Sequence, residues 1–205
     1  MSRAALMVAF VVGGGCTMPQ SARPLAPGRT QVAVGWATLA HPQLEDDADL
    51  ASGQVMVRRG IAARTDAAIV LSRLPSQSAS TSMAMLEAKV RLTPAEGPLT
   101  VSLAVGTGVV WTDDAWDFDR EAVVVTPTLY VGYDLSPTAE IVITARGYLA
   151  AIDDDNQHRE LNGGASIGAR FTDRARTFAL QPQLTVIGAD RETYVTVGVA
   201  MSVGN

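Results

Sequence analysis

Residues 194–203 read YVTVGVAMSV and alternate between two faces without interruption. One face is apolar and carries Val195, Val197, Val199, Met201 and Val203. The other face carries Tyr, Thr, Gly, Ala and Ser. Period-two alternation of this kind predicts a β-strand with one apolar face. A soluble sheet would turn its polar face to water and use Lys and Glu more often, so small residues there favour a membrane barrel, whose apolar face meets lipid.

The same alternation recurs along most of the chain. It predicts strands over residues 31–40, 52–63, 67–75, 82–92, 99–111, 122–135, 139–151, 162–172, 178–188 and 193–203. Most of these segments reach the roughly 9 to 11 residues that a tilted strand needs to cross hydrocarbon, and they exceed the roughly 5 to 6 of soluble sheets. We therefore expect an all-β protein, an antiparallel up-and-down barrel of about ten strands, or eight if the 52–75 region is misassigned.

The connections between these segments alternate between tight and long. Tight ones fall at 64–66, 93–98, 136–138 and 173–177, and longer ones at 41–51, 76–81, 112–121, 152–161 and 189–192. This arrangement resembles the small bacterial outer-membrane β-barrels over residues 31–205, by architecture and not by any motif. The resemblance implies contact with outer-membrane lipid, with both chain ends and the tight turns in the periplasm and the long loops outside the cell.

The N-terminus has the features of a targeting segment. Arg3 is followed by the apolar stretch 4–12, three glycines and Cys16, the single cysteine of the 205-residue chain. This order resembles bacterial lipoprotein signals, which implies a signal peptide over 1–15 and a lipid on Cys16. Gly13 stands where such signals usually have a branched aliphatic residue, which leaves ordinary signal cleavage as the alternative. Residues 16–30 contain three prolines and little apolar periodicity, so we expect a tether before the barrel.

Charged residues within the predicted strands fall on the small-residue faces, which predicts a charged barrel interior. A lumen too narrow for a pore can be filled by paired charges. We expect such a network from seven side chains, with a conducting ion path as the alternative: Arg58, Glu87, Lys89, Arg91, Glu140, Arg146 and Arg170. Arg59 is an exception, because a neighbour of Arg58 should face lipid unless a bulge at Gly60 rotates it away.

The long connections are strongly acidic. They hold fifteen carboxylates against three arginines, a formal charge of −12 within a chain of net charge −5. Carboxylates are ligands for hard cations such as Ca²⁺. Weak divalent-cation contacts are therefore possible at Asp113, Asp114, Asp117, Asp119, Asp153, Asp154 and Asp155. No specific metal motif is present, and solvated, mutually repelling loops explain the same residues.

Several functional classes are disfavoured. The acidic charge and the lack of a basic patch with aromatic residues argue against nucleic-acid binding. His41 and His158 fall in loops and fit neither the surface proteases of the omptin type nor the barrel lipases. No phosphate loop, nucleophile elbow or metal-spaced set of Cys and His is present, so we expect neither an enzyme nor a cofactor.

The sequence thus predicts an outer-membrane lipoprotein barrel with a structural or surface-interaction role through its acidic loops. Its protein partner is not identifiable from the sequence. One alternative is a soluble periplasmic lipoprotein whose lipocalin-like barrel binds a hydrophobic ligand, and another is a narrow channel. The membrane barrel and the lipocalin-like barrel differ in which face of each strand meets water.

Overall fold

The computed structural model describes residues 20–40, 51–75, 80–114, 117–152, 159–189 and 192–204. Its ten strands are β1 (Thr30–Ala40), β2 (Ala51–Ala62), β3 (Thr65–Pro75), β4 (Ser80–Arg91), β5 (Leu99–Asp114), β6 (Asp117–Ser136), β7 (Ala139–Ile152), β8 (Arg159–Thr172), β9 (Phe178–Ala189) and β10 (Glu192–Gly204). In this part of the chain no helix is long and apolar enough to cross a membrane.

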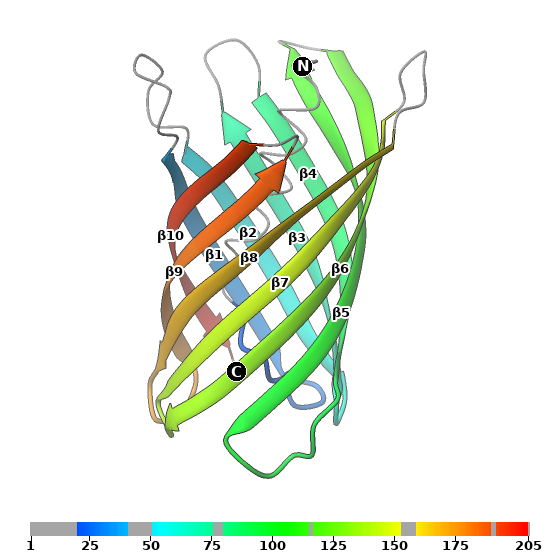
Figure 1. Cartoon of the computed structure of the whole chain (residues 1–205). Helices are drawn as coiled ribbons and strands as arrows, with labels where there is room; N and C mark the ends of the chain where they lie inside the picture. Colours follow the sequence, from blue (N-terminus) through cyan, green and yellow to red (C-terminus); the bar gives the residue numbers. More distant parts are fainter. Residues whose placement is uncertain are drawn as a thin grey trace.

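Each strand pairs with its neighbours in sequence, and β1 closes the sheet by pairing with β10. All pairs are antiparallel, as between Val32 and Val203 at the closure. Figure 1 shows the strands tilted around one axis, with the tight turns and the C-terminus of β10 toward one end, called the turn end here. The predicted antiparallel barrel of ten strands is confirmed, and closure removes the free sheet edges that would otherwise invite aggregation.

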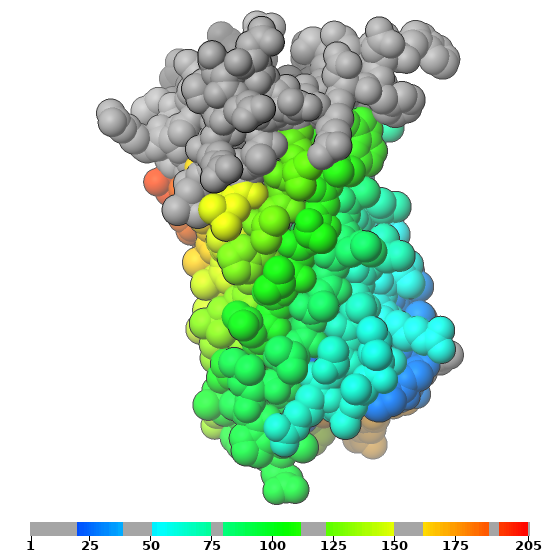
Figure 2. Space-filling model, turned by 90° about the vertical axis from the view of Figure 1, so that its right-hand side faces the viewer, coloured from blue at the N-terminus to red at the C-terminus, as the bar shows by residue number. Residues whose placement is uncertain are grey.

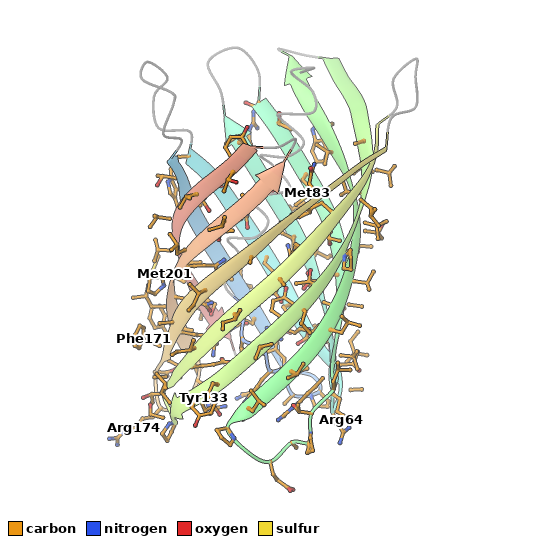
Figure 3. The ribbon with its side chains drawn as sticks, in the orientation of Figure 1. Arg64, Met83, Tyr133, Phe171, Arg174 and Met201 are labelled. Atoms are coloured by element: carbon orange, nitrogen blue, oxygen red, sulfur yellow. The ribbon has the colours of Figure 1, made fainter. Side chains whose placement is uncertain are left out.

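The two faces of the sheet are chemically opposite. Large apolar side chains point outward from the wall, among them Ile69, Leu86, Ile143 and Val197, which are 48 to 61% exposed. Figure 2 shows one side of this wall, and Figure 3 shows its side chains projecting outward, with Met201 among those labelled. The interior faces carry mainly small, polar and charged residues, with some apolar side chains such as Met56, Met83 and Val70 among them. A lipocalin-like barrel has a polar exterior, so the apolar outer wall contradicts this alternative.

The sheet shows which of the neighbours Arg58 and Arg59 faces outward. Arg58 is buried and Arg59 is exposed, so Arg59 lies on the outer face. The β2–β3 register shifts between Gly60 and Ala62, after Arg59, and this shift therefore does not turn Arg59 inward. Arg59 lies three residues from the end of β2, close enough to the barrel rim for its guanidinium to reach an interface.

The aromatic residues divide between the faces. Trp36, Tyr133, Phe171 and Phe178 are exposed on the outer wall, and Figure 3 shows Tyr133 and Phe171 near the turn end. By contrast, Tyr130 and Tyr148 are buried in the lumen at 1% and 3% exposure. These two tyrosines share the faces of Thr128 and Arg146, which are also buried. An aromatic side chain fills a lumen as well as it anchors an interface.

Residues 20–25 lie inside the barrel and residues 26–29 are exposed at its turn end, so residues 20–25 do not form the tether predicted before the first strand. The chain turns at Gly28, whose φ of 78° is in the left-handed region, and donates its amide to the Gly60 carbonyl at 2.9 Å. Gly60 in turn donates to the Arg29 carbonyl at 3.0 Å. A Cβ on Gly60 would lie 2.0 Å from the Ala26 oxygen, so only glycine admits this close approach. Figure 1 shows the segment in dark blue toward the turn end.

Candidate functional site in the barrel lumen

The centre of the lumen holds an ion pair between facing walls. Glu87 of β4 and Arg146 of β7 are both buried, with Arg146 Nη2 donating to Glu87 Oε2 at 3.0 Å. Arg146 also donates to the Tyr130 hydroxyl at 2.9 Å and, through Nε, to Thr128 Oγ1 at 2.8 Å. Tyr130 donates in turn to Glu87 at 3.3 Å. Residues from three strands are thereby tied across the barrel.

Lys89 connects this cluster to residues 20–29, called the N-terminal segment here. Its Nζ lies 4.8 Å from the centre of the Tyr130 ring and donates to Gln20 Oε1 and to the Ser21 carbonyl at 3.2 and 2.9 Å. Gln20 Nε2 donates to Glu87 Oε1 at 3.0 Å. The segment therefore supplies the oxygen atoms that a buried ammonium requires, because an unpaired charge in such a place is costly.

The next residue of the segment, Ala22, is held by β5 and β7, the two strands that flank β6. The Ala22 amide donates to Glu140 of β7 at 3.1 Å, and its carbonyl accepts from Ser102 of β5 at 2.6 Å. Ala22 is fully buried with Ala104, Tyr130 and Val142 around it. A segment whose backbone amide and carbonyl are both satisfied by buried side chains of two strands is a folded part of the barrel.

A second ion pair lies between Arg58 of β2 and Asp66 of β3. Arg58 Nε donates to Asp66 Oδ2 at 2.7 Å, and Arg58 Nη2 pairs with the same oxygen. Arg58 Nη2 also donates to the Arg23 carbonyl at 2.7 Å, while the Leu25 amide donates to Asp66 at 2.8 Å. Both side chains are almost fully buried, and the pair again depends on the N-terminal segment to complete its hydrogen bonds.

The seven side chains predicted for the lumen are placed in two groups. Five are buried inside the barrel: Arg58, Glu87, Lys89, Glu140 and Arg146. Arg91 and Arg170 are half-buried and line a cavity at the turn end of the barrel. Arg91 donates to Thr93 Oγ1 and to the Ala95 carbonyl and does not join the central cluster.

Three members of the network were missed from the sequence. Asp66 was assigned to a tight turn and Gln20 to the tether, and Tyr130 was given no place in the lumen network. The period-two alternation does indicate that Asp66 and Tyr130 face inward. Asp66 shares a face with Ala68 and Val70, and Tyr130 shares one with Thr128. Gln20 has no such signal, since it belongs to no strand.

The remaining predicted residues lie outside what can be described. Cys16 falls outside the described residues, as do Asp153, Asp154 and Asp155. Asp113, Asp114, Asp117 and Asp119 belong to the backbone ladder of β5 and β6, and their side chains are not described. Within the described residues no group of three or more His, Cys, Asp or Glu side chains is arranged to hold a metal ion.

Comparisons with known proteins agree with this geometry. No family model matches the chain, and no curated protein matches it. Among solved structures, an outer-membrane channel from Pseudomonas putida F1 aligns with a TM-score of 0.56 and 14% identity over 91% of this chain and 99% of that one. A bacterial polysaccharide outer-membrane secretin aligns with a TM-score of 0.52 and 13% identity over 85% of this chain and 64% of that one. The chain thus has the fold of the bacterial outer-membrane β-barrels.

Proposed function

We propose that this protein is an integral outer-membrane β-barrel that serves as a closed scaffold for its acidic surface loops. One observation carries the proposal: the apolar side chains encircle the outside of the wall and the charged ones fill the inside. In water this distribution would expose an apolar surface far larger than soluble monomers tolerate. In a bilayer the same surface meets hydrocarbon, while closure satisfies every strand edge.

The occupied lumen supports a scaffold over an open pore. Arg58, Tyr130 and Lys89 are the largest fully buried side chains of the described residues, and the last two contact the N-terminal segment or each other across the interior. An aqueous pore would leave these groups hydrated. Here Lys89 and Tyr130, together with Nε and Nη2 of Arg58, have protein partners, so a narrow channel requires the segment to move.

The role of the loops is inferred from their charge. The proposed orientation puts the tight turns in the periplasm and the loops outside the cell, as in other barrels of this class. A loop charge of −12 then favours basic partner proteins and divalent cations at the surface. We propose no enzymatic role, because the sequence carries no nucleophile elbow, phosphate loop or metal-spaced set of Cys and His.

Lipidation at Cys16 belongs to this proposal through its resemblance to lipoprotein signals. Replacing Cys16 with Ala should abolish incorporation of a labelled fatty acid. Labelling that survives the substitution would contradict a lipid at this position.

The barrel itself is tested by gel migration of membrane-extracted protein in detergent, unboiled against boiled. A closed barrel should migrate differently before and after heating. Absence of a shift, together with release from membranes by high salt, would contradict membrane insertion. Planar-bilayer recording of the folded protein tests the closed lumen: steady conductance from the intact chain would favour the channel suggested by the fold of the Pseudomonas putida protein.

A further inference from the structure

A cavity of about 470 Å³ lies at the turn end of the barrel, beneath the folded N-terminal segment. Its wall is unusually basic. It is lined by two carboxylates, Asp134 and Glu140, and by six arginines: Arg23, Arg29, Arg58, Arg91, Arg170 and Arg176. Six positive and two negative charges leave a formal charge of +4, in a chain whose net charge is −5.

The two carboxylates already have partners. Asp134 forms an ion pair with Arg23, and Glu140 accepts the Ala22 amide at 3.1 Å. Glu140 also lies near enough to Arg170 to interact with it electrostatically. Asp66 does not line the cavity, but it pairs with Arg58, so three carboxylates offset six guanidinium groups. A surplus of three positive charges remains, and the protein walls of the cavity focus their potential.

Arg58 provides an independent sign of a missing ligand. Its side chain is almost fully buried, and Nε and Nη2 are used by Asp66 and the Arg23 carbonyl. Its Nη1 is also buried but has no hydrogen-bond partner. A buried guanidinium N–H without an acceptor is costly, and a water, an ion or a ligand at this place would supply the acceptor.

Arg170 provides a second available group. It extends from β8 opposite Glu140 of β7 and lines the cavity, and among the described residues it makes no hydrogen bond or ion pair at bonding distance. Guanidinium groups bind phosphate oxygens through two parallel N–H bonds, with a geometry that an ammonium cannot reproduce. Arg58 and Arg170 therefore offer donors without acceptors on the wall of one basic cavity.

We propose that this turn-end cavity binds a phosphate ester. Its volume lies in the range of small-molecule sites, about 300 to 1,000 Å³, and exceeds the needs of a bare oxyanion, so the phosphate should be attached to a group of about the size of a sugar or glycerol. Two sources supply this chemistry at the periplasmic rim of a membrane barrel: a soluble sugar phosphate and the headgroup of a phospholipid.

The test is isothermal titration of the full-length, folded protein in a non-ionic detergent at low salt. The probes are glucose 6-phosphate, with glucose as the uncharged control, and dihexanoyl phosphatidylglycerol, with dihexanoyl phosphatidylcholine as the lipid control. Saturable binding of glucose 6-phosphate or phosphatidylglycerol above its control is expected, and the tighter of the two identifies the source. Binding of neither phosphate probe above its control would overturn the proposal.

Variants locate the binding. Arg170→Gln should weaken it at least about tenfold, while Arg170→Lys, which keeps the charge but loses the planar fork, should recover only part of the affinity. Arg64→Gln is the matched control, because Arg64 is an exposed turn residue at the same end that does not line the cavity (Figure 3). An unchanged heat shift on gels shows that each variant is folded. Equal losses in R170Q and R64Q would reveal a general charge effect and refute the site.

Discussion

Glu87→Gln should destabilise the barrel strongly, although it replaces only one carboxylate oxygen with an NH2 group. The carboxylate of Glu87 accepts hydrogen bonds from Arg146 at 3.0 Å, from Gln20 at 3.0 Å and from Tyr130 at 3.3 Å. Gln preserves the shape and one acceptor oxygen but removes the charge. Arg146 and the adjacent Lys89 then remain buried with less compensating negative charge.

The magnitude follows from what remains in the lumen. Breaking a buried ion pair by removing one partner costs about 3 to 5 kcal/mol, mainly because the other charge stays desolvated. We therefore expect the free energy of unfolding to fall by about 3 to 5 kcal/mol in E87Q. Glu96→Gln is the matched control, because Glu96 is an exposed residue between β4 and β5, and surface substitutions of this kind stay within about 0.5 kcal/mol.

The assay is urea unfolding of the protein refolded into phosphatidylcholine vesicles, followed by tryptophan fluorescence. Trp36 is exposed on the outer wall of β1, so its emission should shift when it leaves the lipid. A double-mutant cycle with Arg146→Gln separates the pair from the rest of the lumen, and a coupling free energy of about 0.5 to 3 kcal/mol is expected. A loss below 1 kcal/mol in E87Q, or a coupling near zero, would refute a network held together by this pair.

Three further substitutions test other parts of the structure. Val199→Arg puts a charge on the apolar outer face near the middle of β10 and should cost about 2 to 4 kcal/mol in the same unfolding assay, whereas an unchanged value would argue against lipid contact. Gly60→Val places a side chain against the Ala26 carbonyl and should expose the N-terminal segment to trypsin, while Gly53→Val, where a Cβ meets nothing within 4 Å, should leave digestion unchanged. The hydrogen bond that the Asp173 carboxylate accepts from the first amide of β9 holds its pKa below the usual range. The ionised Asp173 carboxylate therefore supports the β8–β9 turn above about pH 4, and this support is lost as the pH falls through the lowered pKa. In acid, the NMR resonances of the wild-type turn should approach those of Asp173→Ala. At neutral pH they should differ from them.

The strands could be predicted because a membrane barrel imposes the same rule on every one of them. Alternation between an outer and an inner face has a period of two, and a slip of one residue would exchange the faces, so the sequence carries the register as well as the strand. Even β9, with Pro182 in its interior, kept its alternation and its pairing partner Val199. The predicted ends of β6 were short, because Asp117 to Glu121 were counted as an acidic loop, whereas β6 begins at Asp117.

The lumen was harder to predict because its packing is polar. Residues 20–29 resembled a tether, since they have no apolar face to mark a buried segment. Their partners are charged and polar side chains such as Glu87, Lys89 and Asp66, which hold the backbone by hydrogen bonds and not by apolar contact. Periodicity identifies surfaces that meet lipid or an apolar core. It gives no signal for a strandless segment that satisfies buried charges.

The lipid proposed on Cys16 and the segment inside the lumen make opposing demands on the same stretch of chain. Gln20 contacts Glu87, which lies four residues, about 13 Å of strand, from the turn end of β4. Four residues separate Cys16 from Gln20 and span at most about 14 Å. Because barrel strands tilt by about 35 to 45°, this strand distance is about 10 Å along the barrel axis, so the reach leaves only about 4 Å for crossing the wall into the periplasmic leaflet. A lipid there therefore requires Gln20 to leave Glu87 and Lys89. Acyl labelling of Cys16 thus reports on more than targeting: a labelled chain must have its lumen at least partly vacated, and an unlabelled one can keep it filled.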